Sequence, residues 1–174
     1  MRCITIMGMT TFTFVHVVIS LVGILSGLMV LVGLLAGKRL DGWTALFLVT
    51  TVATSVTGFV FPYKGFTPGL GVGIVSIVVL AFAILARYRH HLAGGWRRTY
   101  VITAVTALYL NVFVLIAQLF EKVPSLHELA PKGSEPPFAI TQVVVMAIFV
   151  VLGIFAVKGF REQGRVVDRN ARAA

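Results

Sequence analysis

Four polar side chains within a largely apolar sequence are candidates for holding a ligand or cofactor. They are His16, Asn111, Gln118 and His127. Haem in a helical bundle is held by imidazoles, and His16 and His127 are expected at the same end of the helices that carry them. One interpretation is a small-ligand, haem or redox-accessory site beneath the loop 121–137. We favour a chain without cofactor or metal, since His90 and His91 lie at the opposite end and point in different directions.

Motifs of membrane enzymes and ion-coupled transporters are missing from the sequence. There is no Gly-x-Ser-x-Gly nucleophile elbow, no His-Glu-x-x-His zinc motif and no Cys-x-x-Cys pair, since Cys3 is the sole cysteine. The long apolar stretches contain no Asp, Glu, Lys or Arg, whereas coupling to protons or sodium needs ionisable groups inside the membrane. We expect a protein that is neither an enzyme nor an ion-coupled transporter.

The composition requires lipid rather than water around most of the chain. Of the 174 residues, 58% are hydrophobic and 12% are charged, and the mean hydropathy is +0.97, which excludes an ordinary water-soluble fold. The net charge of +9 would suit nucleic acid, but Lys and Arg form short clusters between apolar runs, the pattern that sets membrane topology. We therefore predict a membrane protein that does not bind nucleic acid.

Five apolar stretches are long enough to cross a bilayer, whose hydrocarbon core of about 30 Å takes about 20 helical residues. They are residues 13–36, 43–61, 69–86, 100–120 and 138–157. The prediction is an all-α transmembrane bundle of five helices in one domain, 1–158, followed by a basic cytoplasmic tail, 159–174. The first stretch is longer than a signal-peptide core and precedes its flanking basic residues, so we expect it to be retained. Met7 and Met9 stay open as alternative start residues.

The distribution of basic residues predicts the orientation. One set of alternate loops, together with the tail, carries 11 of them: Lys38, Arg39, Arg87, Arg89, Arg97, Arg98, Lys158, Arg161, Arg165, Arg169 and Arg172. The other set carries four: Arg2, Lys64, Lys122 and Lys132. Because Lys and Arg are retained on the cytoplasmic side, the N-terminus is predicted outside and the C-terminus in the cytoplasm.

Small and polar residues indicate how the helices pack. Membrane helices approach closely through small residues and bond to one another through polar ones. Asn111 lies near mid-span, where an unpaired amide is costly, so we expect it to bond to the threonines and serine of 43–61. Glycine pairs four residues apart, such as Gly23 and Gly27, are also compatible with a homo-oligomer.

Two polar loops have further interpretations. In the loop 121–137, Ser125 and Glu128 have the capping-box spacing, which predicts a short helical turn that ends at Pro131. At the cytoplasmic end, four arginines cluster beside two spans: Arg87, Arg89, Arg97 and Arg98. We interpret them as topology determinants that contact anionic lipid headgroups. The alternative is a docking site for an acidic cytoplasmic partner.

Four segments have a distinctive sequence: GKRLDGWTALF (37–47), TSVTGF (54–59), ALYLNVF (107–113) and SEPPF (134–138). They resemble a group of small bacterial inner-membrane proteins of uncharacterised function, over about residues 11–157. The resemblance implies a multi-pass protein of the bacterial inner membrane and carries no activity, cofactor or site residue with it. We expect a non-catalytic helical bundle, an accessory or scaffold subunit of a membrane complex, whose partners are lipid and a membrane protein or a second copy of the chain.

Overall fold

The protein is built almost entirely of helices. The computed structural model describes residues 5–6, 9–61 and 68–173. The long helices are α1 (Thr11–Leu35), α2 (Asp41–Gly58), α3 (Pro68–Ile84), α4 (Trp96–Lys122) and α6 (Pro136–Ala173). Two short helical turns, η1 (Leu85–Arg89, π-helical) and α5 (Pro124–His127), complete them. Two strands of two residues each, β1 (Thr5–Ile6) and β2 (Met9–Thr10), pair antiparallel before α1.

Four helices in the described part of the chain are long and apolar enough to cross a membrane. They cover Thr11–Leu35, Gly69–Arg89, Trp96–Lys122 and Pro136–Phe160. These correspond to four of the five predicted stretches. The other stretch, 43–61, forms α2, which has 18 residues and several threonines that lower its hydropathy. The all-helical, membrane-type fold is therefore confirmed.

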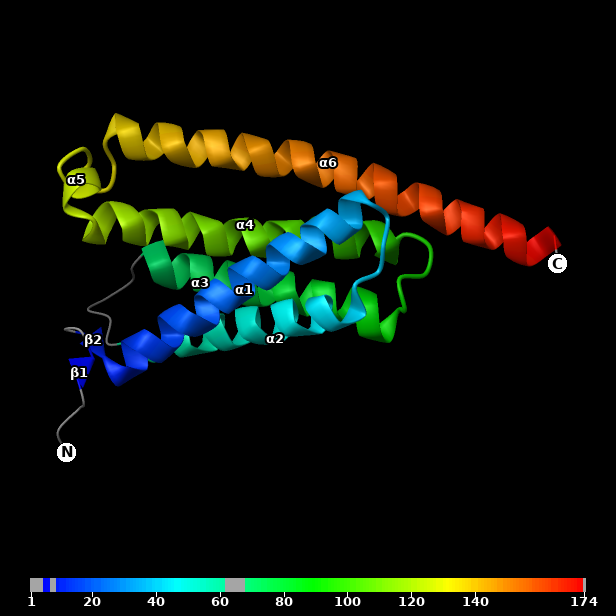
Figure 1. Cartoon of the computed structure of the whole chain (residues 1–174), viewed down its shortest axis with the longest axis horizontal. Coiled ribbons are helices and arrows are strands. Elements are labelled where there is room, and N and C mark those ends of the chain that lie inside the picture. The colour runs from blue at the N-terminus through cyan, green and yellow to red at the C-terminus, as the bar shows by residue number, and fades with distance from the viewer. Residues whose placement is uncertain (1–4, 7–8, 62–67, 174) are drawn as a thin grey trace.

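The five long helices lie side by side and run alternately in opposite directions (Figure 1). Along the chain, α1 contacts α2, α2 contacts α3, α3 contacts α4 and α4 contacts α6. Helices α1 and α4 also contact each other, and α1 contacts α6. The loops 36–40 and 90–95 lie at the same end of the bundle, and α6 continues past that end (Figure 1). The predicted tail, 159–174, is thus a continuation of α6 as far as Ala173.

The core lies where α1, α2 and α4 meet. Phe47 and Leu108 are almost completely buried there. A Cβ atom on Gly27 would lie 2.6 Å from Leu108 Cδ1 and 2.8 Å from Phe47 Cε2, so α1 approaches both neighbours only because it carries glycine at this position. Gly23 is likewise buried and lies beside Thr50 and Thr51. This glycine pair packs inside the chain, which removes it as an argument for an interface with a second copy.

The connection between α3 and α4 is tightly wound. The π-helical turn η1 adds a residue to the helical turn, a feature that often accompanies functional sites. His91 and Leu92 follow with positive φ angles of 48° and 60°, and the side chain of Leu92 is 2% exposed. The ring of His90 stacks on that of Trp96, with centroids 3.8 Å apart. These contacts hold the loop against the end of the bundle and fix where η1 directs its arginines.

Candidate functional site

His16, the first of the four candidates, joins α1 to α2. Its Nδ1 lies 2.8 Å from Thr57 Oγ1, while the Thr57 hydroxyl donates to the carbonyl of Ala53 at 2.7 Å. Because that hydroxyl has one proton to donate, the geometry assigns Nδ1 of His16 as the donor to Thr57. One turn further along, the Ser20 hydroxyl donates to the carbonyl of His16 at 2.8 Å and lies 3.3 Å from Thr54 Oγ1, so Thr54 is the donor between the two hydroxyls. His16 thus belongs to a polar seam between two helices.

Asn111 bonds to the second helix, as predicted. Its Nδ2 donates to Thr51 Oγ1 at 3.1 Å, and Thr51 is completely buried. A Cβ atom on Gly23 would lie within 3.7 Å of both side chains, so α1 closes over this bond. The prediction that Asn111 bonds to a threonine or serine of residues 43–61 is confirmed.

The other two candidates lie away from this seam. Gln118 is exposed, and its Nε2 donates to Glu121 Oε2 at 3.5 Å on the same helix. His127 is exposed on α5. None of the interactions described for the candidates His16, Asn111, Gln118 and His127 joins one of them to another. His16 bonds to Thr57 and Asn111 to Thr51, in different turns of α2, and the structure does not gather the four candidates into one site.

Gln142 is a buried amide on α6 near the same end of the bundle. Its side chain is 7% exposed, and its Nε2 donates to the backbone carbonyl of Phe113 at 3.1 Å. Its Oε1 is buried without a hydrogen-bond partner in the part of the chain that the structure describes. The amide therefore ties α6 to α4 through one of its two polar atoms.

The loop 121–137 contains the predicted helical turn, α5. Ser125 does not cap this turn, and polar contacts in the loop come from Glu135. Helix α5 begins at Pro124, and Ser125 makes no capping bond because it lies inside the turn, one residue after the proline. Instead, the carboxylate of Glu135 accepts hydrogen bonds from the backbone N–H groups of Lys132 and Ser134, each at 3.0 Å. Partial burial raises the pKa of Glu135, but these amide donors outweigh it and hold the pKa below its usual value.

At the opposite end of the bundle, the side chain of Arg87 is buried, whereas the sequence predicts it among lipid headgroups. Its side chain is 4% exposed, and its Nη2 donates to Oδ1 of Asp41, the first residue of α2. The guanidinium carbon also lies 5.3 Å from the ring centroid of Tyr100, whose hydroxyl donates to Thr44 Oγ1 at 3.3 Å. A headgroup role does not fit Arg87, because the folded chain encloses its charge.

The cluster of Asp41, Arg87, Tyr100 and Thr44 was not found by sequence reasoning. One signal was available: Asp41 is the sole acidic residue before Glu121, and it lies at the membrane end that carries most of the arginines. A lone carboxylate beside such a cluster is a strong candidate for a buried ion pair.

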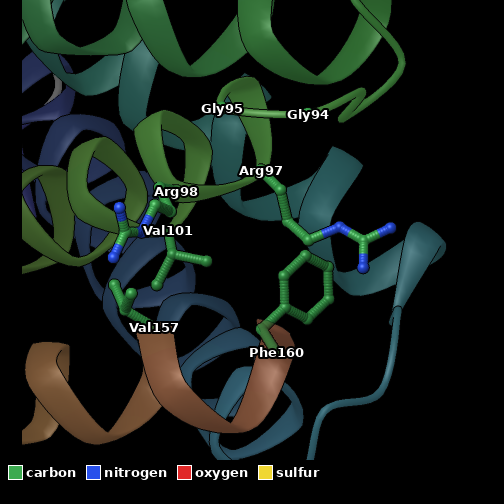
Figure 2. Close-up of a pocket in the computed structure, with 7 residues that line it drawn as sticks. All are labelled: Gly94, Gly95, Arg97, Arg98, Val101, Val157 and Phe160. Atoms are coloured by element: carbon green, nitrogen blue, oxygen red, sulfur yellow. The ribbon is translucent and has the colours of Figure 1, made fainter. Parts of the chain in front are cut away.

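The remaining arginines have different surroundings. Arg89 is exposed. The guanidinium of Arg97 lies 5.5 Å from the ring centroid of Phe160 on α6, and Figure 2 shows the two side chains next to each other at the edge of a hollow. Arg98 lies on the other side of this hollow, beyond Val101 (Figure 2). The hollow has a volume of about 230 Å³ and is bordered by Gly94 and Gly95.

A second, larger hollow lies between α4 and α6. Its volume is about 450 Å³, and its lining consists of Arg98, Ile102, Val105, Thr106, Tyr109, Met146, Phe149, Val150, Gly153, Ile154, Val157 and Lys158. The two basic residues lie at one end of it, because α4 and α6 are antiparallel. Both hollows share Arg98 and Val157, so they adjoin.

Metal ligands do not gather in the described residues: no three His, Cys, Asp or Glu side chains there are close enough to hold an ion. Comparison of the chain with protein-family models, curated protein sequences and solved structures gives no match.

Proposed function

We propose that α2 is a fifth membrane span, so that the chain crosses the bilayer five times with its N-terminus outside and its C-terminus in the cytoplasm. The 18 residues of α2 cover about 27 Å, close to the thickness of the hydrocarbon core. Four of its threonines have partners on the neighbouring helices: Thr44, Thr51, Thr54 and Thr57. Beyond its first two residues, its exposed side chains are apolar: Trp43, Leu46, Val49 and Val56. A helix with this polarity suits a bundle in lipid.

Cysteine labelling tests this topology. In a Cys3→Ser background, single cysteines replace Lys38, Val60, Gly94 or Ser134, and intact cells are treated with a membrane-impermeant maleimide. Five spans predict labelling at 60 and 134, and labelling at 38 and 94 only after permeabilisation. Equal accessibility of positions 38 and 60 would mean that α2 does not cross the membrane.

The protein acts as a non-catalytic accessory or scaffold subunit of a complex in the bacterial inner membrane. The observation that carries this proposal is the length of α6, which has 38 residues and so measures about 57 Å, whereas a span needs about 30 Å. Its final part extends past the other helices (Figure 1). A helical segment without tertiary packing gains little stability in water, so a partner surface that packs against this arm, residues 161–173, would stabilise it. The arm contains four arginines, Arg161, Arg165, Arg169 and Arg172, against two acidic residues, Glu162 and Asp168, and this excess of positive charge favours an acidic partner.

The polar residues of the bundle also support a structural role. His16, Ser20, Asn111 and Tyr100 bond to the side chains of α2. Interhelical bonds of this kind stabilise membrane bundles by roughly 0.6 to 2 kcal/mol each. Because these side chains already bond to those of α2, they are not free to bind a ligand. We therefore propose that the protein acts by binding a partner through its outer surface and the α6 arm.

Extraction in mild detergent followed by native mass spectrometry tests the function. The expected result is a membrane-protein partner bound in fixed ratio, lost when the four arginines of the arm are replaced by glutamine and retained in the control Lys122→Gln/Lys132→Gln, which changes the opposite end. A bound small molecule or haem without a partner would favour a ligand-binding or redox-accessory protein instead. Protein that carries neither would contradict both functions.

A further inference from the structure

We infer that the face between α4 and α6 is a binding site for one anionic phospholipid, with an acyl chain in the groove and the headgroup at Arg98 and Lys158. The groove is the hollow of about 450 Å³ described above. Apart from its two basic residues, its lining is almost wholly apolar, with Thr106 and the Tyr109 hydroxyl as the exceptions. An apolar channel with cations at one end matches the polarity of such a lipid.

The length of the groove corresponds to one leaflet. On α4 it extends from Arg98 to Tyr109, and on α6 from Lys158 to Met146. At 1.5 Å per residue these intervals measure about 17 and 18 Å, slightly more than half of a hydrocarbon core of about 30 Å. The groove thus begins at the membrane surface and ends near mid-bilayer, where an acyl chain ends.

Among the residues whose side chains the structure describes, none supplies a counter-charge at the basic end of the groove. Arg98 and Lys158 are exposed on two different helices, and no acidic side chain lines either hollow. The smaller hollow adjoins this end and is open beside Gly94 and Gly95, where a Cβ atom would meet nothing within 4 Å. It offers room for a headgroup next to the first turn of α4, whose partial positive charge adds to that of the arginines.

The shape of the groove favours a lipid over another helix. Helices in membranes pack through small residues that let their backbones approach, but only Gly153 and Thr106 in the lining are of this kind. The remaining lining residues have β-branched, aromatic or long side chains, which keep the two backbones apart and leave the hollow between them. The proposed orientation decides which leaflet supplies the lipid. Binding of the lipid to the groove does not depend on that orientation.

Native mass spectrometry of the isolated chain, titrated with phosphatidylglycerol or with phosphatidylcholine of the same acyl chains, tests the headgroup. We expect one phosphatidylglycerol to bind more tightly than phosphatidylcholine. Since each basic residue near a membrane surface contributes about fivefold, Arg98→Gln/Lys158→Gln should weaken phosphatidylglycerol binding roughly 25-fold. The control Lys38→Gln/Arg89→Gln removes two exposed charges at the same end and should leave it unchanged. Equal loss in the control, or equal affinity for both lipids, would overturn the proposal.

Filling the groove tests the acyl chain. Gly153→Leu should lower the affinity for phosphatidylglycerol at least tenfold, whereas Val151→Leu, on the exposed face of the same helix, should not. Ile154→Trp is a second filling variant, checked like the first for native helix content by circular dichroism. Unchanged affinity in a folded filling variant, or displacement of the lipid by inorganic phosphate, would show that surface charge alone binds the headgroup. Either result would overturn the proposal. So would a protein partner or a second copy that occupies the groove and is lost in the filling variants.

Discussion

The carboxylate of Asp41, at the start of α2, bonds to the guanidinium of Arg87, at the end of the third helix. The pair is asymmetric, since the Arg87 side chain is 4% exposed and that of Asp41 is 72% exposed. A buried guanidinium depends on its partner more than an exposed carboxylate does. This contact fixes the end of η1 against α2.

Replacement of Asp41 by Asn should destabilise the protein by about 1–3 kcal/mol, because it leaves the buried Arg87 charge without its anion. Arg39 also lies near Asp41, at 3.8 Å, but both side chains are largely exposed. Arg39→Gln therefore serves as the control, with an expected change below about 0.5 kcal/mol. Thermal unfolding in detergent micelles measures both. Similar losses in the two variants would show that Arg87 does not rely on Asp41.

The bond between Asn111 and Thr51 should contribute about 0.6 to 2 kcal/mol. A double-mutant cycle with Asn111→Leu and Thr51→Val measures it as the coupling energy between the two changes. Thr50→Val is the matched control, because the Thr50 hydroxyl donates to the carbonyl of Leu46 within its own helix. Coupling of Asn111 to position 50 as strong as that to position 51 would contradict the assigned bond.

Two glycines of α6 should respond differently to alanine. A Cβ atom on Gly159 would lie 2.6 Å from the backbone carbonyl oxygen of Leu35, whereas one on Gly153 would lie 3.5 Å from Val105 Cγ1. Gly159→Ala should cost about 1–3 kcal/mol, because α6 must move away from the end of α1. Gly153→Ala should be neutral or stabilising, since alanine is the better helix former. Unfolding midpoints of the two variants in the same micelles provide the comparison, and a stable Gly159→Ala would refute the close crossing.

The turn before α6 should open in acid. The folded-state pKa of Glu135 is lowered from 4.5, so its stabilising contribution is present above that value and is lost as the pH falls through the folded pKa. Hydrogen exchange of the Lys132 and Ser134 amides should accelerate over that interval. Glu135→Ala should exchange rapidly at every pH, and Glu128→Gln, at an exposed position, should behave like the unaltered protein. Protection that persists well below the folded pKa would argue against the carboxylate as acceptor.

The sequence predicted a contact where a single residue must have a hydrogen-bond partner. Asn111 had to find a partner because an amide at mid-span is costly, and the threonine-rich segment was the nearest source. The pairing of Asp41 with Arg87 could not be predicted in the same way. It depends on η1, whose extra residue turns Arg87 inward, and neither that turn nor the neighbouring position of α2 can be read from local spacing.

The glycine and capping patterns predicted which kind of contact or turn forms, but not which residues take part in it. The spacing of Gly23 and Gly27 indicated close packing, but whether the partner was another copy or the same chain depended on tertiary structure. Likewise Ser125 and Glu128 indicated a helical turn, yet Pro124 starts it one residue too early for Ser125 to cap it. The interface groove between α4 and α6 had no sequence signature, because its lining comes from two helices whose register is set by packing.

The inward polarity of α2 also bears on how the chain enters the membrane. Its threonines obtain their interhelical partners only when α1 and α4 are beside it, so as a separate segment it would expose those hydroxyls to lipid. Since α1 is strongly apolar and contacts α2 along its length, insertion as a helical hairpin would shield His16 and Ser20 together with Thr57 and Thr54. On the proposed five-span topology, membrane insertion of α2 would therefore depend on the helix synthesised before it.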